Sequence, residues 1–133
     1  MTKIGEDAFS LCGSLTTIHI PDGVTEIGNE AFYICTSLTT ITIPDSVREI
    51  GYEAFSECKK LNSIKIPDSV TKIDGRAFRE CDNLTIIVKK GSYAMQYCIE
   101  NELKYICHLN FFSYITSHLP ILRKVSNLLK RRK

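Results

Sequence analysis

Apolar residues recur along most of this chain with a period of 23 residues. The segment Ile-Pro-Asp-Ser-Val occupies residues 43–47 and returns at residues 66–70. Aligned at this step, residues 1–89 repeat one pattern, V-x-x-I-G-x-x-A-F-x-x-C-x-x-L-x-x-I-x-I-P-D-x. Self-similarity at one fixed period of this length predicts a solenoid, in which each copy forms one coil and buries its apolar face against its neighbours.

Each copy predicts two short extended segments joined by tight turns. Two isoleucines near its end, such as Ile41 and Ile43, lie two residues apart and point to the same side of a strand. The proline that follows cannot donate to a ladder and ends the strand, and Pro-Asp-Ser or Pro-Asp-Gly then favours a turn. Val-x-x-Ile predicts a second extended segment, the glycine after it a left-handed or tight position, and Ala-Phe-x-x-Cys a short helical turn.

The recurring apolar slots predict the core, because a constant register places them inside every coil. The repeated phenylalanines, cysteines and leucines are Phe9, Phe32, Phe55 and Phe78, Cys12, Cys35, Cys58 and Cys81, and Leu15, Leu38, Leu61 and Leu84. The inward isoleucine pairs are Ile18/Ile20, Ile41/Ile43 and Ile64/Ile66. In the fourth copy the same two slots hold Ile87 and Lys89.

The strand positions between these inward residues predict one continuous outer surface. They are Thr17 and His19, Thr40 and Thr42, Ser63 and Lys65, and in the fourth copy Ile86 and Val88. Threonine is favoured in strands for its own sake, so these residues are either ordinary strand formers or a partner-binding face. We take Thr17, His19, Thr40, Thr42, Ser63 and Lys65 as the candidate partner-binding residues.

The repeat resembles the BspA-like leucine-rich repeats, the 23-residue class of bacterial and protist surface proteins. The residues that match cover about residues 1–89, and residues 90–105 are similar to the helical segment that closes such arrays. The resemblance implies a strand-rich right-handed solenoid of about four rungs with a helical C-terminal cap. It also implies a cell-surface or secreted location, binding of a protein partner or adhesion, and no enzymatic activity. Residues 106–133 match nothing in that family and form a third segment.

The N-terminal end departs from a complete array. Met1 takes the place that valine holds in the other copies, so the first coil begins in mid-pattern. No apolar signal-peptide region follows Met1. We expect a fragment of a longer surface array or a cytoplasmic product, and self-association at the uncapped first rung, whose Met1, Ile4, Phe9, Leu15 and Ile18 are expected to be more exposed than their equivalents.

Charge separates residues 106–133 from the rest of the chain. The net charge is +2, but residues 1–105 carry 11 Lys and Arg against 15 Asp and Glu, whereas residues 106–133 carry six basic residues and no acidic one. The apolar positions from Ile121 to Leu129 have helical spacing. The basic residues beside them are Arg123, Lys124, Lys130, Arg131, Arg132 and Lys133. This tail is therefore either a cover on the last coil or a basic amphipathic helix that binds a membrane or a partner; nucleic acid is not favoured, because the solenoid itself is not basic.

No residue pattern indicates catalysis, a cofactor or a metal. The four repeated cysteines stack in a line, which is not the tetrahedral arrangement that zinc needs, and no Cys-x-x-Cys spacing occurs. We expect a buried ladder of reduced thiols, and a Cys98–Cys107 disulfide stays open as an alternative. The three histidines, His19, His108 and His118, have no nucleophile or metal motif around them.

Overall fold

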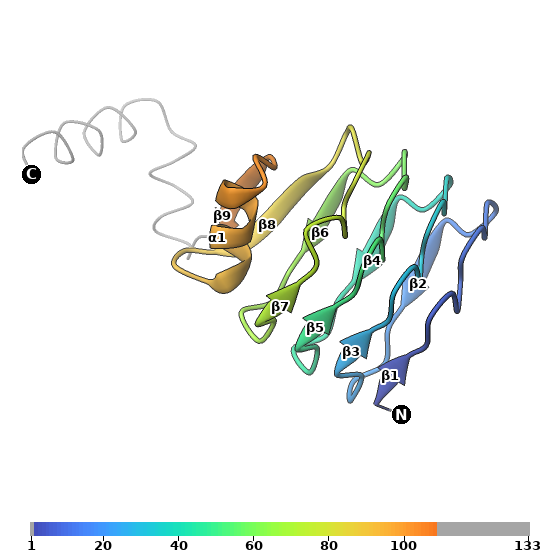
Figure 1. Cartoon of the computed structure of the whole chain (residues 1–133), viewed down its shortest axis with the longest axis horizontal. Coiled ribbons are helices and arrows are strands. Elements are labelled where there is room, and N and C mark those ends of the chain that lie inside the picture. Colours follow the sequence, from blue (N-terminus) through green and yellow to red (C-terminus); the bar gives the residue numbers. More distant parts are fainter. Residues whose placement is uncertain (1, 109–133) are drawn as a thin grey trace, which may run out of the picture.

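The computed structural model describes residues 2–108, which form a solenoid of stacked coils (Figure 1). Its strands are β1 (Lys3–Ile4), β2 (Thr17–His19), β3 (Glu26–Ile27), β4 (Thr40–Thr42), β5 (Glu49–Ile50), β6 (Ser63–Lys65), β7 (Lys72–Ile73), β8 (Thr85–Lys89) and β9 (Tyr105–His108). One helix, α1 (Tyr93–Glu100), lies between β8 and β9. The described part of the chain contains no helix long and apolar enough to cross a membrane.

Two parallel sheets run along the solenoid, one on each side of the core. The first has the order β1-β3-β5-β7 and is built from the Val-x-x-Ile segments. The second has the order β2-β4-β6-β8-β9 and is built from the Ile-x-Ile segments. Strand partners such as Lys3 and Glu26, or Thr17 and Thr40, are 23 residues apart, so each copy of the repeat forms one rung and pairs with the equivalent strand of the next copy. Both predicted extended segments of each copy are confirmed.

Stacked phenylalanine rings form the centre of the core. The ring centroids of Phe9, Phe32, Phe55 and Phe78 are 5.3, 5.2 and 5.4 Å apart in order, and the ring planes lie within 5° of parallel. Phe32 and Phe55 are fully buried, as are the leucines and cysteines of the same two coils. The predicted inward register of these residues is confirmed.

The Ala-Phe-x-x-Cys segments form hydrogen-bonded turns rather than the expected helical turn. In the first coil, Asp7 and Leu11 adopt left-handed backbone angles, with φ of 58° and 62°, and the second and third coils repeat both positions. These angles direct the N–H groups of the loop to the next coil, as in Phe9 N–H to the Ala31 carbonyl oxygen at 2.8 Å, instead of to the preceding turn. The left-handed residues are therefore not the glycines of the repeat.

The repeated glycines are needed for close approach. A Cβ atom on Gly28 would lie 2.7 Å from the Ile4 carbonyl oxygen, and a Cβ on Gly51 would lie 2.7 Å from the Asn29 backbone nitrogen. Backbone atoms of the preceding coil leave no room for a side chain at these two positions. The tight-position half of the glycine prediction is thus correct, and its left-handed half is wrong.

The fourth coil shifts by one residue, which corrects the predicted register there. Ser63 pairs with Thr85, a step of 22 residues, because one residue fewer separates Leu84 from its strand. Ile86 and Val88 are therefore buried, at 1% and 0% exposed, although the 23-residue alignment placed them outside and placed Ile87 and Lys89 inside. A shift of one residue exchanges the two faces of a strand, because side chains alternate with a period of two.

The helical cap is confirmed and a fifth strand lies beside it. Ser92 caps α1 by accepting a hydrogen bond from the Met95 backbone N–H at 3.2 Å, and Tyr97 packs edge-on against Phe78 with ring centroids 6.4 Å apart. The strand β9 then pairs in parallel with β8, so the second sheet has five rungs where four were expected.

Candidate functional site

The outer surface of the second sheet is continuous across five rungs. Each of the first four rungs turns two side chains outward, the fifth adds Ile106, and successive rungs align them into two columns. We call this surface the strand face; its residues are Thr17, Thr40, Ser63 and Thr85 in one column and His19, Thr42, Lys65, Ile87 and Ile106 in the other. All six of the candidate partner-binding residues lie on it: Ser63 is half-buried and the other five are exposed.

The chemical character of the strand face changes from one end to the other. At the N-terminal end the Thr40 hydroxyl lies 3.3 Å from the Thr17 hydroxyl, within hydrogen-bonding distance. Lys65 follows in the middle, where it makes no ion pair within residues 2–108. At the C-terminal end Ile87 is half-buried and Ile106 is 53% exposed. The face therefore offers hydroxyl groups, one free ammonium group and an apolar end.

The apolar end was missed by the sequence reasoning. The 23-residue alignment placed Ile86 and Val88 on this face, and Ile106 was assigned to the tail. The alternation Thr-Ile-Ile-Val-Lys over residues 85–89 is compatible with either face, because three consecutive apolar residues carry no period-two signal. Only the pairing with β6 and β9 shows that Ile87 is the outward residue.

A groove of about 390 Å³ lies beside the second column of the strand face. Thr42, Lys65 and the Pro-Asp turns of adjacent coils line it, with Asp22, Asp45, Pro44 and Pro67 from the turns. Within the described chain, the carboxylates of Asp22 and Asp45 form no ion pair, whereas Asp68 of the next turn pairs with Lys89 at 3.2 Å. The groove thus presents both a positive and a negative charge next to hydroxyl groups.

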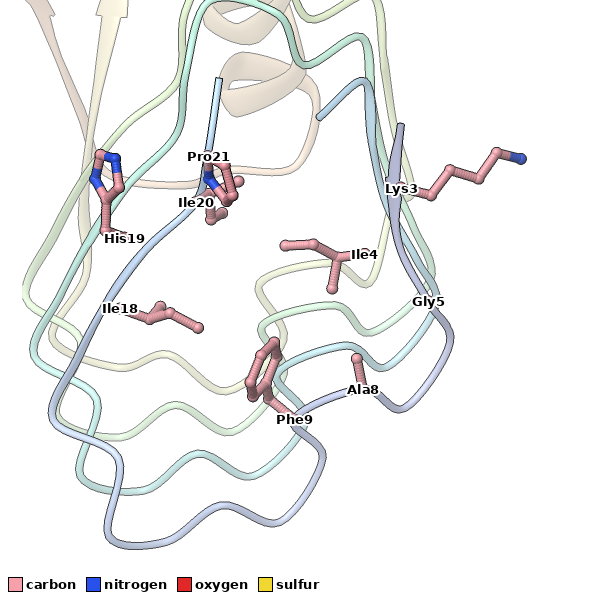
Figure 2. Close-up of a pocket in the computed structure, with 9 residues that line it drawn as sticks. All are labelled: Lys3, Ile4, Gly5, Ala8, Phe9, Ile18, His19, Ile20 and Pro21. Atoms are coloured by element: carbon pink, nitrogen blue, oxygen red, sulfur yellow. The ribbon is translucent and has the colours of Figure 1, made fainter. Parts of the chain in front are cut away.

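A second hollow, of about 330 Å³, opens at the N-terminal end of the described coils (Figure 2). Ile4, Ile18, Ile20 and Phe9 point into it, whereas Lys3 and His19 point away. Phe9, Leu15 and Ile18 are partly exposed, and their equivalents Phe32, Leu38 and Ile41 are buried. The greater exposure expected of these three residues is confirmed, whereas Ile4, at 7% exposed, is buried like its equivalents. Met1 lies outside the described residues, and self-association stays a prediction.

The thiol ladder has the expected alignment but not uniform burial. Cys35 and Cys58 are buried, whereas Cys12 and Cys81 in the end coils are only partly buried. The Cys58 thiol donates to the Phe32 carbonyl oxygen at 3.2 Å, and Cys35 and Cys81 make the same contact to Phe9 and Phe55. Cys98 and Cys107 are both free, and Cys107 Sγ lies 4.0 Å from Met95 Sδ.

Electrostatics of the buried thiols do not favour a nucleophile. Desolvation raises the pKa of Cys35, and burial raises the pKa of Cys98 to about 11. A hydrogen bond with Cys81, together with desolvation, raises the pKa of Cys58. A catalytic cysteine needs the opposite, an exposed thiol with a lowered pKa. Cys81 differs from the other three thiols, because its hydrogen bond with Cys58 lowers its pKa, but its side chain is partly buried. Within residues 2–108, no group of three or more His, Cys, Asp or Glu side chains is arranged to hold a metal ion.

The basic tail falls outside the described residues. Arg123, Lys124 and the run from Lys130 to Lys133 were the candidate contacts to a membrane or partner. The structure describes the chain only as far as His108. The tail therefore stays a sequence-based hypothesis.

Comparison with known proteins identifies the repeat. The profile of the family described as "BspA type Leucine rich repeat region (6 copies)" matches residues 2–124. The match extends past residue 105, so the expectation that residues 106–133 match nothing in the family is wrong for residues 106–124. No curated protein matches the chain at a significant level.

Solved structures of bacterial leucine-rich repeat proteins have the same fold. A leucine-rich repeat protein of T. pallidum is 30% identical over 65% of this chain, with a TM-score of 0.57. A leucine-rich cell surface protein of Faecalibacterium prausnitzii is 27% identical over 86% of this chain, with a TM-score of 0.68. A leucine-rich repeat protein from Bacteroides ovatus is 35% identical over 82%, with a TM-score of 0.59. The chain spans 52%, 31% and 29% of these three proteins, respectively.

Proposed function

Because this chain belongs to the BspA-type leucine-rich repeat family, we propose that it is a non-enzymatic interaction or adhesion module that binds a protein partner through its strand face. Repeat proteins of this kind commonly use the extended surface that stacking creates. The similar protein of Faecalibacterium prausnitzii is described as a cell surface protein, which supports a surface location for this chain. The raised pKa values of the Cys35 and Cys98 thiols argue against a nucleophilic role for these two residues.

One observation carries the proposal: the strand face is both continuous and chemically graded. Five parallel rungs hold its residues in fixed register. Because this surface is already ordered, binding a partner costs little conformational entropy on the side of this chain. Hydroxyl groups, the free Lys65 ammonium group and the exposed Ile106 provide hydrogen-bonding, charged and apolar contacts on one side of the molecule. We expect the central contacts at Thr42, Ser63 and Lys65 to contribute most of the binding free energy.

The proposal is tested by placing charge at the centre of this face. The variant carries Thr42→Glu with Ser63→Glu, and a matched control carries Thr36→Glu with Thr71→Glu, two exposed positions off the strand face. The parent chain is screened for binding against purified extracellular-matrix proteins, and the two variants are then compared on the protein that it binds. We expect the strand-face variant to bind at least tenfold more weakly, with a thermal melt close to that of the control.

Retained binding by the strand-face variant would contradict the proposal. The same samples are sedimented with vesicles that contain a phosphatidylserine fraction, because a basic tail would bind anionic lipid. Binding to these vesicles, unaffected by the strand-face changes, would assign the adhesive role to residues 106–133 instead. If the parent chain binds neither the matrix proteins nor the vesicles, the result would contradict an adhesive role for the strand face.

A further inference from the structure

The loop of the last coil has two backbone N–H groups without the acceptors that every earlier loop has. Pairs of loop N–H groups, two residues apart, donate to carbonyl oxygens of the next coil throughout the solenoid. The pairs are Phe9 to Ala31 at 2.8 Å and Leu11 to Tyr33 at 2.7 Å, Phe32 to Ala54 at 2.8 Å and Ile34 to Ser56 at 2.9 Å, and Phe55 to Ala77 and Glu57 to Arg79, both at 2.8 Å. The equivalent N–H groups of Phe78 and Glu80 have no acceptor among residues 2–108.

The cap pairs with two other backbone groups at this end of the solenoid, and a side chain of the coil itself pairs with a third. The Ile73 backbone N–H donates to the Tyr93 hydroxyl at 3.1 Å, and the Tyr97 hydroxyl donates to the Asp74 carbonyl oxygen at 2.8 Å. The N–H of Arg76 finds the Asp74 side-chain oxygen at 3.0 Å. Helix α1 therefore covers the end of the first sheet and leaves the loop edge uncovered.

A hollow of about 220 Å³ remains at this edge, between the last loop and the cap. We call it the loop-edge groove; its residues are Gly75, Arg76, Phe78, Arg79 and Glu80 from the loop and Tyr97, Asn101 and Leu103 from the cap. A whole additional coil does not fit, because Tyr97 already packs against Phe78, where the next phenylalanine of a coil would stack. The groove has room for a single segment of chain.

The donors and charges define what such a segment must present. Two N–H groups at positions i and i+2 match two carbonyl oxygens of an extended polypeptide, as in recognition by strand addition. Arg79 already lies 3.6 Å from Glu53 and 3.7 Å from Glu80, but Arg76 is exposed and makes no ion pair within the described chain. In the earlier coils the position of Arg76 holds Asp7, Glu30 or Glu53. A carboxylate on the incoming segment would complement the Arg76 guanidinium.

We propose that the loop-edge groove binds an extended acidic polypeptide segment of a partner protein, with its backbone carbonyl oxygens on the Phe78 and Glu80 N–H groups and a carboxylate beside Arg76. The site is separate from the strand face and uses backbone donors, so it recognises the conformation and charge of a segment more than its sequence. It would give the module a second point of attachment to its partner.

The test uses the full-length chain labelled with nitrogen-15 and a short peptide probe. The probe is acetylated and amidated and copies residues 5–10 with serine in place of phenylalanine; its neutral control has glutamine and asparagine in place of the two acidic residues. We expect the amide resonances of Phe78 and Glu80 to move on titration, and hydrogen exchange at both to slow about tenfold at saturation. Arg76→Glu should weaken binding about fivefold, and Arg48→Glu, on another exposed surface, should not.

Four results would overturn the proposal. The two resonances could fail to move with the acidic probe, or could move equally with the neutral one. They could shift with protein concentration alone, which would make a second copy the occupant. They could already be strongly protected from exchange in the free chain, which would mean that the chain's own residues fill the groove. The probe should bind the Thr42→Glu, Ser63→Glu variant as it binds the parent chain, which would show that the loop-edge groove and the strand face are separate sites.

Discussion

Replacing Phe55 by alanine tests the central claim of the packing, that stacked phenylalanine rings support the coils from within. Phe55 is fully buried and lies between two parallel rings, with centroid distances of 5.2 Å to Phe32 and 5.4 Å to Phe78. The substitution removes a large apolar side chain and leaves a cavity that the neighbouring coils cannot close without losing their ladder hydrogen bonds.

The magnitude follows from this environment. Removal of a buried phenylalanine costs about 3–5 kcal/mol of unfolding free energy. Two ring contacts are lost, and each adds about 0.5–1.5 kcal/mol beyond area burial, so we expect the upper half of that range. A domain of this size has a total stability of about 5–15 kcal/mol, so one substitution removes a large share of it. The thermal midpoint should fall by about 12–20 °C.

The assay is chemical and thermal unfolding followed by far-ultraviolet circular dichroism, since the chain has no tryptophan. Phe9→Ala is the graded control, because Phe9 is partly exposed and stacks on one ring only; it should cost about half as much. Tyr52→Ala, at a side chain 37% exposed in the third coil, should cost little. A loss below about 1 kcal/mol for Phe55→Ala, or equal losses for Phe55 and Phe9, would refute the reasoning.

Three further predictions follow from the thiols and the loop carboxylates. In native protein, a thiol reagent should modify Cys12, Cys81 and Cys107 faster than the buried Cys35, Cys58 and Cys98, whereas denatured protein should show all six; rapid native reaction of Cys58 would contradict the ladder. Cys58→Ser should lower the unfolding free energy by only about 1 kcal/mol, the low end of the range for a buried hydroxyl, because the hydroxyl inherits the Phe32 carbonyl acceptor at the 3.2 Å position; a loss above about 3 kcal/mol would mean that the hydroxyl is unpaired. Desolvation and the neighbouring Asp7 and Glu53 carboxylates raise the pKa of Glu30 in the folded state. The ionised Glu30 carboxylate therefore lowers the free energy of unfolding at pH values above its folded pKa, and this destabilisation disappears as the pH falls through that value. Glu30→Gln should therefore raise the melting temperature at about pH 7 and leave it unchanged near pH 4, relative to Glu100→Gln, and the reverse pH trend would show that the carboxylate is stabilised in the fold.

The sequence by itself determined the parts of this protein that repeat. Identical spacing in every copy forces identical residues onto the same line of the solenoid, so the inward phenylalanines, leucines and cysteines and the outward positions of β2, β4 and β6 could be predicted from the 23-residue period. The candidate residues Thr40, Thr42 and Lys65 lie where that period placed them. The helix after Gly91 was also predicted, and Ser92 caps it.

Tertiary structure decided the parts where the period fails. The one-residue shift in β8 places Ile87, rather than Ile86, on the strand face. Three consecutive apolar residues do not indicate which of them points outward until the pairing of the strand is known. The loop conformation depends on N–H groups that donate to the next coil, so hydrogen bonds to residues 22 positions away override the local propensity for a helical turn. The same physics produces the loop-edge groove. The loop N–H groups donate to the next coil, so those of Phe78 and Glu80 are left without an acceptor in the described chain where α1 and β9 replace that coil.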